Sequence, residues 1–256
     1  MVIRDWSSDV CSSDLPAFTR CMRIQRNKKK TSMNRVEIFT VIAALLSLPL
    51  LPAQGVPAWY PVFSWETVPV YQMFGSPEVL TAEQAATIAK TGDFICIEKA
   101  HGFKTLGAAE LGAKQEIAVF KRLNPRTRAL FYFNAARAWP FTTYSKGLRY
   151  GEIRDDFKAF IAKDPKTGEL AHKDRIYCFN VLNPEFRTWW TETVAKGVRE
   201  TGADGLFVDQ MHGNAWLHPG KQAEVAAAQA EMMRLTRPAP GPEKLLLLNK
   251  GAHIPE

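Results

Sequence analysis

Short apolar runs alternate with helical segments between residues 68 and 249, and this order limits the fold more than any other feature of the sequence. The apolar runs show no alternation of polar and apolar residues, which is typical of strands buried on both faces. Repeated strand–helix–strand units predict parallel strands joined by helical crossovers. We expect strands at Val68–Phe74, Asp93–Glu98, Arg128–Asn134, Asp204–Val208 and Leu245–Asn249.

The helices between these runs carry recognisable start signals. Thr81 and Asn183 are residues that favour the N-cap position, and Pro184 follows Asn183 at the first helical position. Apolar residues recur at helical spacing after Pro184, which predicts a helix with one buried face. We expect helices at Thr81–Lys90, Ala108–Leu123, Glu152–Ala162, Pro184–Thr201 and Lys221–Leu235, and an extended run at Arg175–Asn180.

Two parallel architectures fit this order, an eight-stranded barrel and an open doubly wound sheet. The doubly wound sheet loses support because no G-x-G-x-x-G or G-x-x-x-x-G-K-[ST] motif follows an expected strand. We therefore predict an α/β fold of the (β/α)8 TIM-barrel type. A complete barrel has eight strands in about 250 residues, whereas about five strands are expected here. We expect a (β/α) barrel domain over residues 54–256 that is truncated at its C-terminal side.

The first 53 residues are expected to lie outside the folded domain. Asp5–Leu15 (DWSSDVCSSDL) matches the in-frame translation of a short-read sequencing adapter, so residues 1–32 are interpreted as an artefact and upstream sequence without a fold. Residues 33–53 combine a basic start, the apolar run Val41–Leu51 and a small residue at Ala53, which is typical of a signal peptide. The run is shorter than the roughly 20 residues of a spanning helix. We predict a secreted or periplasmic protein without a stable membrane span; an uncleaved N-terminal anchor is the alternative.

Composition excludes several classes of function. Residues 1–54 hold eight Lys or Arg and four Asp or Glu, so they carry +4 of the formal net charge of +7 and leave +3 on the remaining chain. That balance does not favour nucleic-acid binding. No spacing of Cys and His predicts a metal site, and we expect no cofactor. Cys96 and Cys178 are interpreted as buried free thiols, with a single disulfide as the alternative. The oligomeric state is not predicted.

Polar residues gather where the expected strands end. Because the carboxyl ends of parallel strands meet at one edge, these side chains are expected to line a common site, as they do in barrels of this type. Asp209 is the most informative, since burying an unpaired carboxylate costs several kcal/mol. A strand should end on such a group only where it has a partner or a chemical role. The residues concerned are Tyr71, Gln72, Glu98, Lys99, His101, Asn134, Asp209, Gln210, Asn249 and Lys250.

Two neighbouring segments resemble a known family. Asn183–Glu185 (N-P-E) and Trp189–Trp190 precede Asp204–Asp209 (D-G-L-F-V-D). This pattern resembles the region around the nucleophile strand in the α-glucosidase and α-galactosidase type of glycoside hydrolase barrels. In that family the second Asp of the strand is the catalytic nucleophile, and the matching residue here is Asp209. The next residues are Gln210–His212 (Q-M-H) rather than the M-N-E of the α-glucosidase type, so the resemblance does not carry the substrate over. The chain after residue 53 is similar to secreted bacterial glycoside hydrolases.

Glycoside hydrolysis needs two carboxyl groups, one to stabilise or attack the anomeric carbon and one to protonate the leaving oxygen. We interpret Asp209 as the nucleophile or catalytic carboxylate and Glu98 as a second candidate, either as the acid or in substrate binding. The alternatives are structural: Asp209 is paired to Lys99 or caps a loop, and Glu98 forms an ion pair. The resemblance implies an acid/base on a later strand, beyond Glu256. Predicted substrate-binding residues are Tyr71, His101, Asn134, Trp139, Gln210, His212 and Asn249.

The predicted function is hydrolysis of glycosidic bonds in an oligo- or polysaccharide, with that carbohydrate as the partner. A non-catalytic carbohydrate-binding barrel is one alternative, because the sequence contains no evident second acid. A metal-dependent deacetylase is another, although no His/Asp ligand cluster supports it. Asp204, at the other end of the strand that leads to Asp209, is interpreted as structural.

Overall fold

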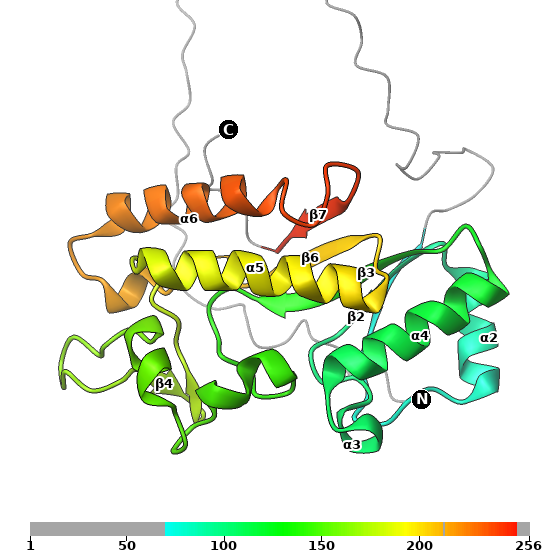
Figure 1. Ribbon diagram of the computed structural model, residues 1–256, viewed down its shortest axis with the longest axis horizontal. Helices are drawn as coiled ribbons and strands as arrows, with labels where there is room; N and C mark the ends of the chain where they lie inside the picture. Colours follow the sequence, from blue (N-terminus) through cyan, green and yellow to red (C-terminus); the bar gives the residue numbers. More distant parts are fainter. Residues whose placement is uncertain (1–69, 212, 250–256) are drawn as a thin grey trace, which may run out of the picture. The chain divides into compact units, whose positions relative to one another are not determined.

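The computed structural model of the protein describes residues 70–211 and 213–249, which all lie in one compact unit (Figure 1). The predicted signal peptide at residues 33–53, the adapter-like segment before it and His212 lie outside the described residues. No helix in the described ranges is long and apolar enough to cross a membrane.

A five-stranded parallel sheet is the centre of the described fold (Figure 1). Its order, β1-β2-β3-β6-β7, follows the order of the strands along the chain. The five predicted strands are therefore confirmed, with small differences at their ends. Their bounds are Tyr71–Phe74 for β1, Phe94–Ile97 for β2, Arg128–Asn134 for β3, Gly205–Asp209 for β6 and Leu245–Leu248 for β7.

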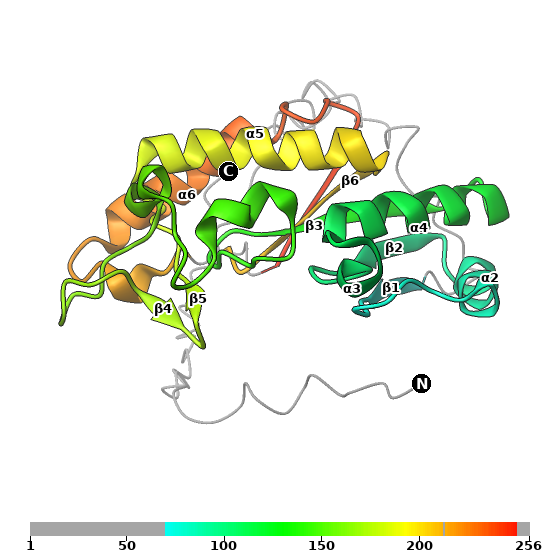
Figure 2. The ribbon, with the colours of Figure 1, turned by 60° about the horizontal axis from the view of Figure 1, so that its bottom comes forward.

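Each pair of neighbouring strands in this sheet is connected through a helix. Four predicted helices are confirmed as α2 (Ala82–Thr91), α4 (Ala109–Leu123), α5 (Pro184–Thr201) and α6 (Gln222–Thr236). Parallel strands joined in this way almost always form right-handed crossovers, so an unreversed strand order puts successive helices on the same side of the sheet. Figure 2 shows α4 and α5 along that side. This winding is that of a barrel, because a doubly wound sheet reverses its strand order.

Both edges of the described sheet are open. Within residues 70–249, β1 pairs only with β2 and β7 only with β6. The mixed α/β class and the parallel sheet of five strands are thus established. Closure into an eight-stranded barrel stays a prediction.

The central strands are buried on both faces, as their unalternated apolar sequences predicted. The larger core cluster lies on the helix side, where the rings of Phe133 and Trp190 meet at a centroid distance of 6.1 Å. Successive side chains of a strand point to opposite faces, so a second cluster forms on the other face of the sheet. Its buried members are Cys96, Leu130, Tyr132 and Phe207.

Two helices begin at the predicted N-cap residues, Thr81 and Asn183. The Thr81 hydroxyl accepts the backbone N–H of Gln84 at 3.2 Å, and the Gln84 side chain accepts the N–H of Thr81 at 2.9 Å, which forms a capping box. The Asn183 side chain accepts the N–H of Glu185 at 2.8 Å, with Pro184 as the first helical residue. The contacts of Asn183 fix where α5 begins and hence which of its residues face the sheet.

The predicted helix at Glu152–Ala162 is wrong. The segment instead forms a 3-10 helix, η2, at Asp155–Phe160. In the tighter 3-10 geometry, residues three positions apart lie on the same side. Phe157 and Phe160 have that spacing, and both rings contact Trp189 of α5, at centroid distances of 5.6 and 5.5 Å. Packing on α5 therefore outweighs the local preference for an α-helix.

Several short elements in the connections were not predicted. The expected extended run Arg175–Asn180 contains β5 (Ile176–Tyr177), which pairs antiparallel with β4 (His172–Lys173). The turn between them has Asp174 and Arg175 at φ values of +54° and +62°, a geometry in which Asn and Gly are the usual residues. Because the turn lacks its usual residues, the sequence did not predict the hairpin. The other short elements are α3 (Phe103–Leu106), η1 (Thr143–Leu148) and η3 (Ala215–Leu217).

Candidate functional site

The carboxyl ends of β3, β6 and β7 bring three of the predicted site residues together. Asn134 lies opposite Asp209 in the register of β3 and β6, and Asn249 follows β7 on the other side of β6. Because side chains alternate along a strand, Tyr132, Asn134 and Asp209 share the face opposite the helices. The site is therefore built at the carboxyl ends of three adjacent strands of the sheet.

Asp209 is half-buried and is held by neutral donors on both sides. Its Oδ2 accepts the Tyr132 hydroxyl at 2.5 Å and the Asn134 Nδ2 at 3.0 Å. Its Oδ1 accepts the Asn249 Nδ2 at 2.8 Å. A carboxylate has about four lone-pair sites. These three hydrogen bonds therefore fix its orientation and leave acceptor capacity on Oδ1.

Tyr132 is a site residue that the sequence analysis missed. Burial, and then the negative charge of Asp209, raise the pKa of its phenol, so the hydroxyl keeps its proton and acts as the donor to Asp209. An aromatic residue within an apolar strand is normally read as core, which explains the omission. The available signal was its position two residues before Asn134, because that spacing puts both side chains on one face.

Asn134 forms hydrogen bonds both to Asp209 and to the backbone of the segment that follows β3. It is 3% exposed, and its amide nitrogen also donates to the Gln210 Oε1 at 3.3 Å. Its amide oxygen accepts the backbone N–H groups of Ala136 and Arg137, at 2.9 and 2.7 Å. With both ends of the amide engaged in the protein, Asn134 acts as a residue that positions Asp209.

Gln210 lies at the same edge, directly after Asp209. Its φ of +55° is in the left-handed region, which costs a residue other than glycine on the order of 1 kcal/mol. Such conformations persist where the surrounding structure imposes them, and they concentrate at functional sites. Here the left-handed turn ends β6 immediately after the carboxylate.

Glu98 follows β2 and points to the same face as Asp209. Its carboxylate forms an ion pair with Lys99. A Cβ atom at Gly75 would lie 2.8 Å from the Glu98 Oε2, so the end of β1 requires a glycine to admit this side chain. One strand, β3, separates Glu98 from Asp209, and neighbouring strands lie about 4.8 Å apart. Glu98 therefore lies at the edge of the site and not among the hydrogen-bond partners of Asp209.

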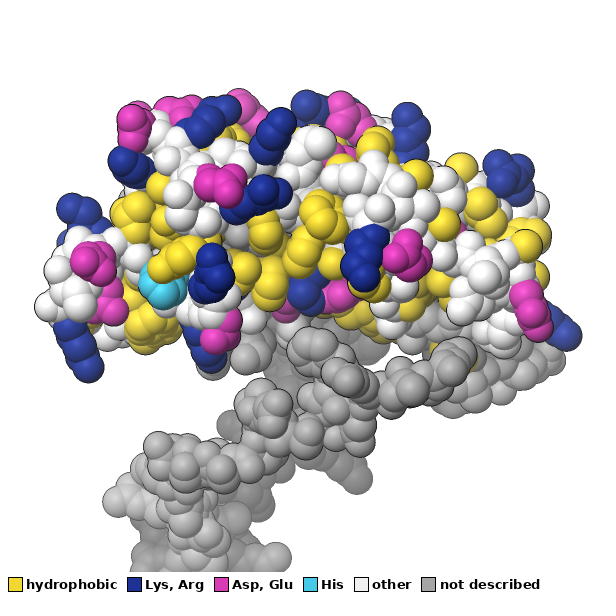
Figure 3. Space-filling model, turned by 90° about the horizontal axis from the view of Figure 1, so that it is seen from below, with side chains coloured by type: hydrophobic (Ala, Val, Ile, Leu, Met, Phe, Trp, Pro, Cys, Tyr) yellow, Lys and Arg dark blue, Asp and Glu magenta, His cyan; other side chains and the backbone are white. Residues whose placement is uncertain are grey.

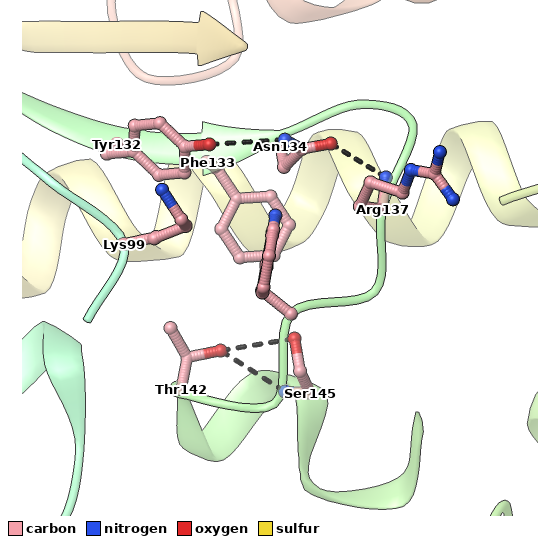
Figure 4. Close-up of a pocket in the computed structure, with 8 residues that line it drawn as sticks. Lys99, Tyr132, Phe133, Asn134, Arg137, Thr142 and Ser145 are labelled. Carbon is pink, nitrogen blue, oxygen red and sulfur yellow. Dashed lines mark hydrogen bonds between the residues drawn. The ribbon is translucent and has the colours of Figure 1, made fainter. Parts of the chain in front are cut away.

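Lys99 extends across a small pocket beside Asp209. Its Nζ lies 5.6 Å from the ring centroid of Tyr132 and 5.3 Å from that of Trp139. Burial lowers the pKa of Lys99, and the charge of Asp209 opposes that shift. Figure 4 shows Lys99 directed toward the Tyr132 ring. The full lining is Lys99, Tyr132, Phe133, Asn134, Arg137, Trp139, Thr142 and Ser145.

Trp139, a predicted substrate-binding residue, is part of this pocket. Its ring stacks on Phe141 at a centroid distance of 5.8 Å and an interplanar angle of 14°. Its indole Nε1 is buried and has no hydrogen-bond partner among the described residues. The stacked pair holds the indole in place as one wall of the pocket.

The structure places Tyr71 at the start of β1 and not at its carboxyl end, so the strand-end argument for this residue is wrong. Tyr71 is the first residue of β1, which continues to Phe74, and it pairs with Phe94. Phe94 in turn pairs with Arg128, six positions before Asn134 on β3, which corresponds to about 20 Å along the strand. The sequence analysis counted Tyr71 among the strand ends although its strand runs on beyond it.

His101 is also removed from the proposed sugar contacts. It is fully buried, its Nδ1 accepts the backbone N–H of Ser76 at 3.2 Å, and its Nε2 lies 3.1 Å from the Glu116 Oε1. A left-handed turn at Gly102, with φ of +70°, follows directly and turns the chain under α4. His101 therefore ties the β1 and β2 connections to α4. The partner Glu116, on another helix, left no local signal in the sequence.

His212 and the two cysteines are the remaining residues that the sequence singled out. His212 lies outside the described residues. Cys96 and Cys178 are buried free thiols, and burial raises the pKa of Cys96 to about 12. No group of three His, Cys, Asp or Glu side chains within the described ranges is arranged to hold a metal ion.

The described surface carries charges of both signs. Figure 3 shows Lys and Arg side chains interspersed with Asp and Glu side chains over the face seen from below, with hydrophobic side chains between them. Interspersed charges of this kind give no extended field of one sign. This face of the molecule therefore gives no long-range preference for a ligand of one charge.

The second half of the chain matches a known protein family. Residues 121–254 match the family described as "Hypothetical glycosyl hydrolase family 15". No protein of curated function matches the sequence. The matched residues include β3, β6 and β7, and so contain Asp209 and its three donors.

Several solved structures of low sequence identity align with this chain, and the first of those named here shares its fold. The glycoside hydrolase domain of PelA from Pseudomonas aeruginosa is 13% identical, with a TM-score of 0.50 over 72% of this chain and 60% of that chain. Ega3 from Aspergillus fumigatus, in complex with galactosamine, is 13% identical, with a TM-score of 0.44 over 71% and 61%. The α-galactosidase TtGalA from Thermus thermophilus is 18% identical, with a TM-score of 0.48 over 70% and 37%. The chain thus spans about 60% of the length of the PelA domain, and that likeness concerns the fold alone.

Proposed function

The chain belongs to the family described as hypothetical glycosyl hydrolase family 15, and we propose that it hydrolyses glycosidic bonds in an oligo- or polysaccharide with Asp209 as nucleophile or catalytic carboxylate. The observation that carries this proposal is the environment of Asp209. Its carboxylate ends a buried strand, is oriented by Tyr132, Asn134 and Asn249, and adjoins a polar and aromatic pocket. We include in the proposal the (β/α)8 barrel, of which the five-stranded sheet forms part.

The geometry of Asp209 suits the charge that develops in this reaction. Cleavage of a glycosidic bond passes through a positively charged, oxocarbenium-like state at the anomeric carbon. The Oδ1 of Asp209 accepts one hydrogen bond, from Asn249, and keeps a lone pair for that carbon. The Oδ2 accepts from Tyr132 and Asn134, which hold the carboxylate plane still. Fixing the negative charge before the reaction reduces the reorganisation needed in the transition state.

Trp139 and Lys99 supply walls of the proposed sugar pocket. Sugar rings present C–H groups that pack on aromatic faces, and the Trp139 ring lines the pocket. The Lys99 ammonium has three N–H donors, which suit sugar hydroxyl oxygens. Its charge also interacts with Asp209. We assign both residues to binding and orienting the sugar beside the carboxylate.

Glu98 is assigned to holding Lys99 and contacting substrate rather than to proton donation. A general acid must carry a proton, whereas an ion pair with a lysine stabilises the carboxylate form. Glu98 forms such a pair with Lys99. The resemblance to α-glucosidases and α-galactosidases implies a proton donor on a later strand of the barrel.

The ion pair of Glu98 also favours a second candidate function, a non-catalytic carbohydrate-binding barrel. In that case Asp209 accepts a hydrogen bond from a sugar hydroxyl and no bond is cleaved. Binding and hydrolysis measured on the same carbohydrate distinguish the two functions, because the second gives binding alone.

We also propose that the protein is exported, to the periplasm or out of the cell. The support is the sequence of residues 33–53, whose basic start, apolar run and small residues are those of a signal peptide. An exported hydrolase meets extracellular or envelope polysaccharides, which agrees with the proposed substrate.

The test of the proposed hydrolysis uses the full chain and its Asp209→Asn variant. The substrates are dextran, soluble starch, galactomannan and chitosan, and the readout is the release of reducing ends. We expect wild type to cleave at least one of them and the variant to lose at least about a thousandfold in kcat, because the charge that attacks or stabilises the anomeric carbon is gone. Circular dichroism of the variant checks that the fold is kept.

Each other outcome has a defined meaning. A variant as active as wild type excludes Asp209 as the catalytic carboxylate. Wild-type binding without cleavage of any of the four polysaccharides favours the non-catalytic barrel.

A further inference from the structure

Trp216 is an exposed tryptophan in the connection from β6 to α6. Its side chain is 55% exposed, the largest exposure of any large hydrophobic residue in the described part of the chain. Tryptophan is normally among the more buried residues, because its large apolar surface gains most from leaving water. The position of this ring on the surface therefore needs a reason.

The backbone that carries Trp216 has an imposed conformation. Gln210, Gly213 and Asn214 have φ values of +55°, +59° and +52°. Two of these residues are not glycine, so their left-handed conformations are held by contacts elsewhere. Two of those contacts come from Asn214, which is fully buried. Its Nδ2 donates to the carbonyl oxygens of Ala136 and Phe179, at 2.8 and 2.9 Å.

Further hydrogen bonds hold the connection on its other side. The backbone N–H of Met211 donates to the carbonyl of Asn249 at 3.2 Å, and the Gln229 side chain of α6 donates to the carbonyl of Met211. The N–H of Leu217 closes the η3 turn on the carbonyl of Asn214 at 2.8 Å. The Trp216 backbone is thus fixed before any ligand arrives. Little conformational entropy is then lost when a ligand binds to its side chain.

The connection starts at the proposed catalytic carboxylate. Trp216 is seven residues after Asp209, so their Cα atoms are at most about 25 Å apart. A continuous set of contacts also joins them, because Asn134 holds Asp209 and Ala136, and Ala136 holds Asn214. Hydrogen bonds therefore fix the connection that carries Trp216 relative to the carboxyl ends of the strands, where Asp209 lies.

From these observations we infer that Trp216 is a stacking platform for a sugar ring outside the pocket where the bond is cleaved. The substrate is then a carbohydrate chain of several sugars rather than a disaccharide or a small glycoside. This inference rests on the proposed glycoside hydrolase function and deepens it by naming the size class of the substrate. The chemistry is the packing of sugar C–H groups on the flat indole face.

A sugar ring fits this surface better than a protein partner. A stable protein interface buries about 800 Å² on each side around several apolar anchors. No other large exposed hydrophobic side chain among the described residues lies between β6 and α6. Pro219 and Gly220, three and four residues after Trp216, are exposed as well. A single open aromatic ring matches one sugar unit of a chain.

The experiment compares Trp216→Ala and Trp216→Phe with wild type in the full chain. The control is Leu123→Ala, which removes a 51% exposed side chain at the end of α4, the helix that leads to the start of β3 at the opposite edge of the sheet. Binding is measured by affinity electrophoresis in gels that contain dextran, starch, galactomannan or chitosan. The kcat and KM are measured on the polymer that is cleaved and on its shortest cleavable oligosaccharide.

We expect Trp216→Ala to bind the polymer about tenfold more weakly, as truncation of an aromatic anchor usually does. The loss should appear in KM for the polymer, with the shortest oligosaccharide unaffected. Trp216→Phe should recover part of the binding, and Leu123→Ala should match wild type. Equal binding of the polymer by wild type and Trp216→Ala overturns the inference, and so does an equal loss on the shortest oligosaccharide.

The outcome also separates this inference from the proposed hydrolysis. If wild type binds a polymer without cleaving it, hydrolysis fails as the function, and the binding difference alone still decides the role of Trp216. If wild type neither binds nor cleaves any of the four polymers, both proposals fail.

Discussion

Asp204 and Asp209 stand at the two ends of the same strand, β6, and their surroundings differ in kind. Asp204, before the first residue of β6, lies 2.9 Å from the Lys121 Nζ and 3.5 Å from the Arg128 Nη1. It also accepts the backbone N–H of Ala129 at 2.9 Å. Asp209, the last residue of β6, takes its hydrogen bonds from a phenol and two amides.

The difference separates a structural carboxylate from a chemical one. Two cations at fixed positions neutralise Asp204, so its charge is used within the fold. Neutral donors orient Asp209 without cancelling its charge, which is then available to a positive centre in a ligand. The residue type is the same in both places. What distinguishes the two ends is whether the hydrogen-bond donors to the carboxylate are charged or neutral.

Short of removing the Asp209 carboxylate, the largest effect should come from moving it. Asp209→Glu keeps the charge but shifts it by about one methylene, and a displacement near 1 Å can cost about a hundredfold in rate. We expect kcat on the best polysaccharide to fall by about that factor. Asp204→Glu is the matched control, and its kcat should stay within about twofold of wild type. Equal kcat values for the two variants would mean that Asp204 and Asp209, at the two ends of β6, do not differ in their role in the reaction.

A smaller effect should follow from removing one donor to Asp209. Tyr132→Phe deletes the hydroxyl that donates at 2.5 Å, and we expect kcat to fall about tenfold, the value of one charge-assisted hydrogen bond. The control is Tyr144→Phe, whose hydroxyl donates to the Glu200 carboxylate at 2.6 Å on α5, away from the site. Steady-state rates of the two variants check the prediction. A loss of rate in Tyr144→Phe as large as that in Tyr132→Phe would contradict it.

A change at Asp204, at the amino end of β6, should lower the stability of the protein and leave its kcat unchanged. Asp204→Asn leaves Lys121 and Arg128 without their shared anion, and these groups are partly exposed to solvent. We expect the free energy of unfolding to fall by about 1 kcal/mol, discounted for solvent screening. Urea unfolding measures this change. The kcat per folded molecule should be unaltered, and a tenfold loss of kcat would show that the amino end also serves catalysis.

The smallest effect concerns the dependence of stability on pH through Lys99. Burial lowers the pKa of Lys99 below its usual 10.5. Between the lowered value and 10.5 the unfolded chain binds a proton that the folded chain does not, so stability from this group rises with pH. We expect the difference in unfolding free energy between wild type and Lys99→Met to grow in favour of wild type as pH approaches 10.5. A difference that is flat with pH would mean that Lys99 is not desolvated.

The sequence predicted the sheet because its strands are short apolar runs whose order is visible along the chain. The parallel winding and the edge that holds Asp209 follow from that order. The 3-10 turn at Asp155–Phe160 was not predictable, since it depends on the contact of Phe157 and Phe160 with Trp189. Contacts between distant residues leave no local pattern.

The candidate site shows the same division. Asp209, Asn134 and Asn249 were found because each is a polar residue at the end of an apolar run. Tyr132 was missed because a buried phenol looks like core, and His101 was misassigned because its partner, Glu116, lies on α4. Strand-end position therefore identifies which polar groups reach the edge. It does not reveal which of them are already satisfied within the fold.

The most direct measurement assays Asp209→Asn and Asp204→Asn side by side, for kcat on the polysaccharide that wild type cleaves fastest. We expect Asp209→Asn to lose at least about a thousandfold in kcat, and Asp204→Asn to keep the wild-type kcat per folded molecule. Retention of the wild-type rate by Asp209→Asn would contradict the central claim that this carboxylate performs the chemistry.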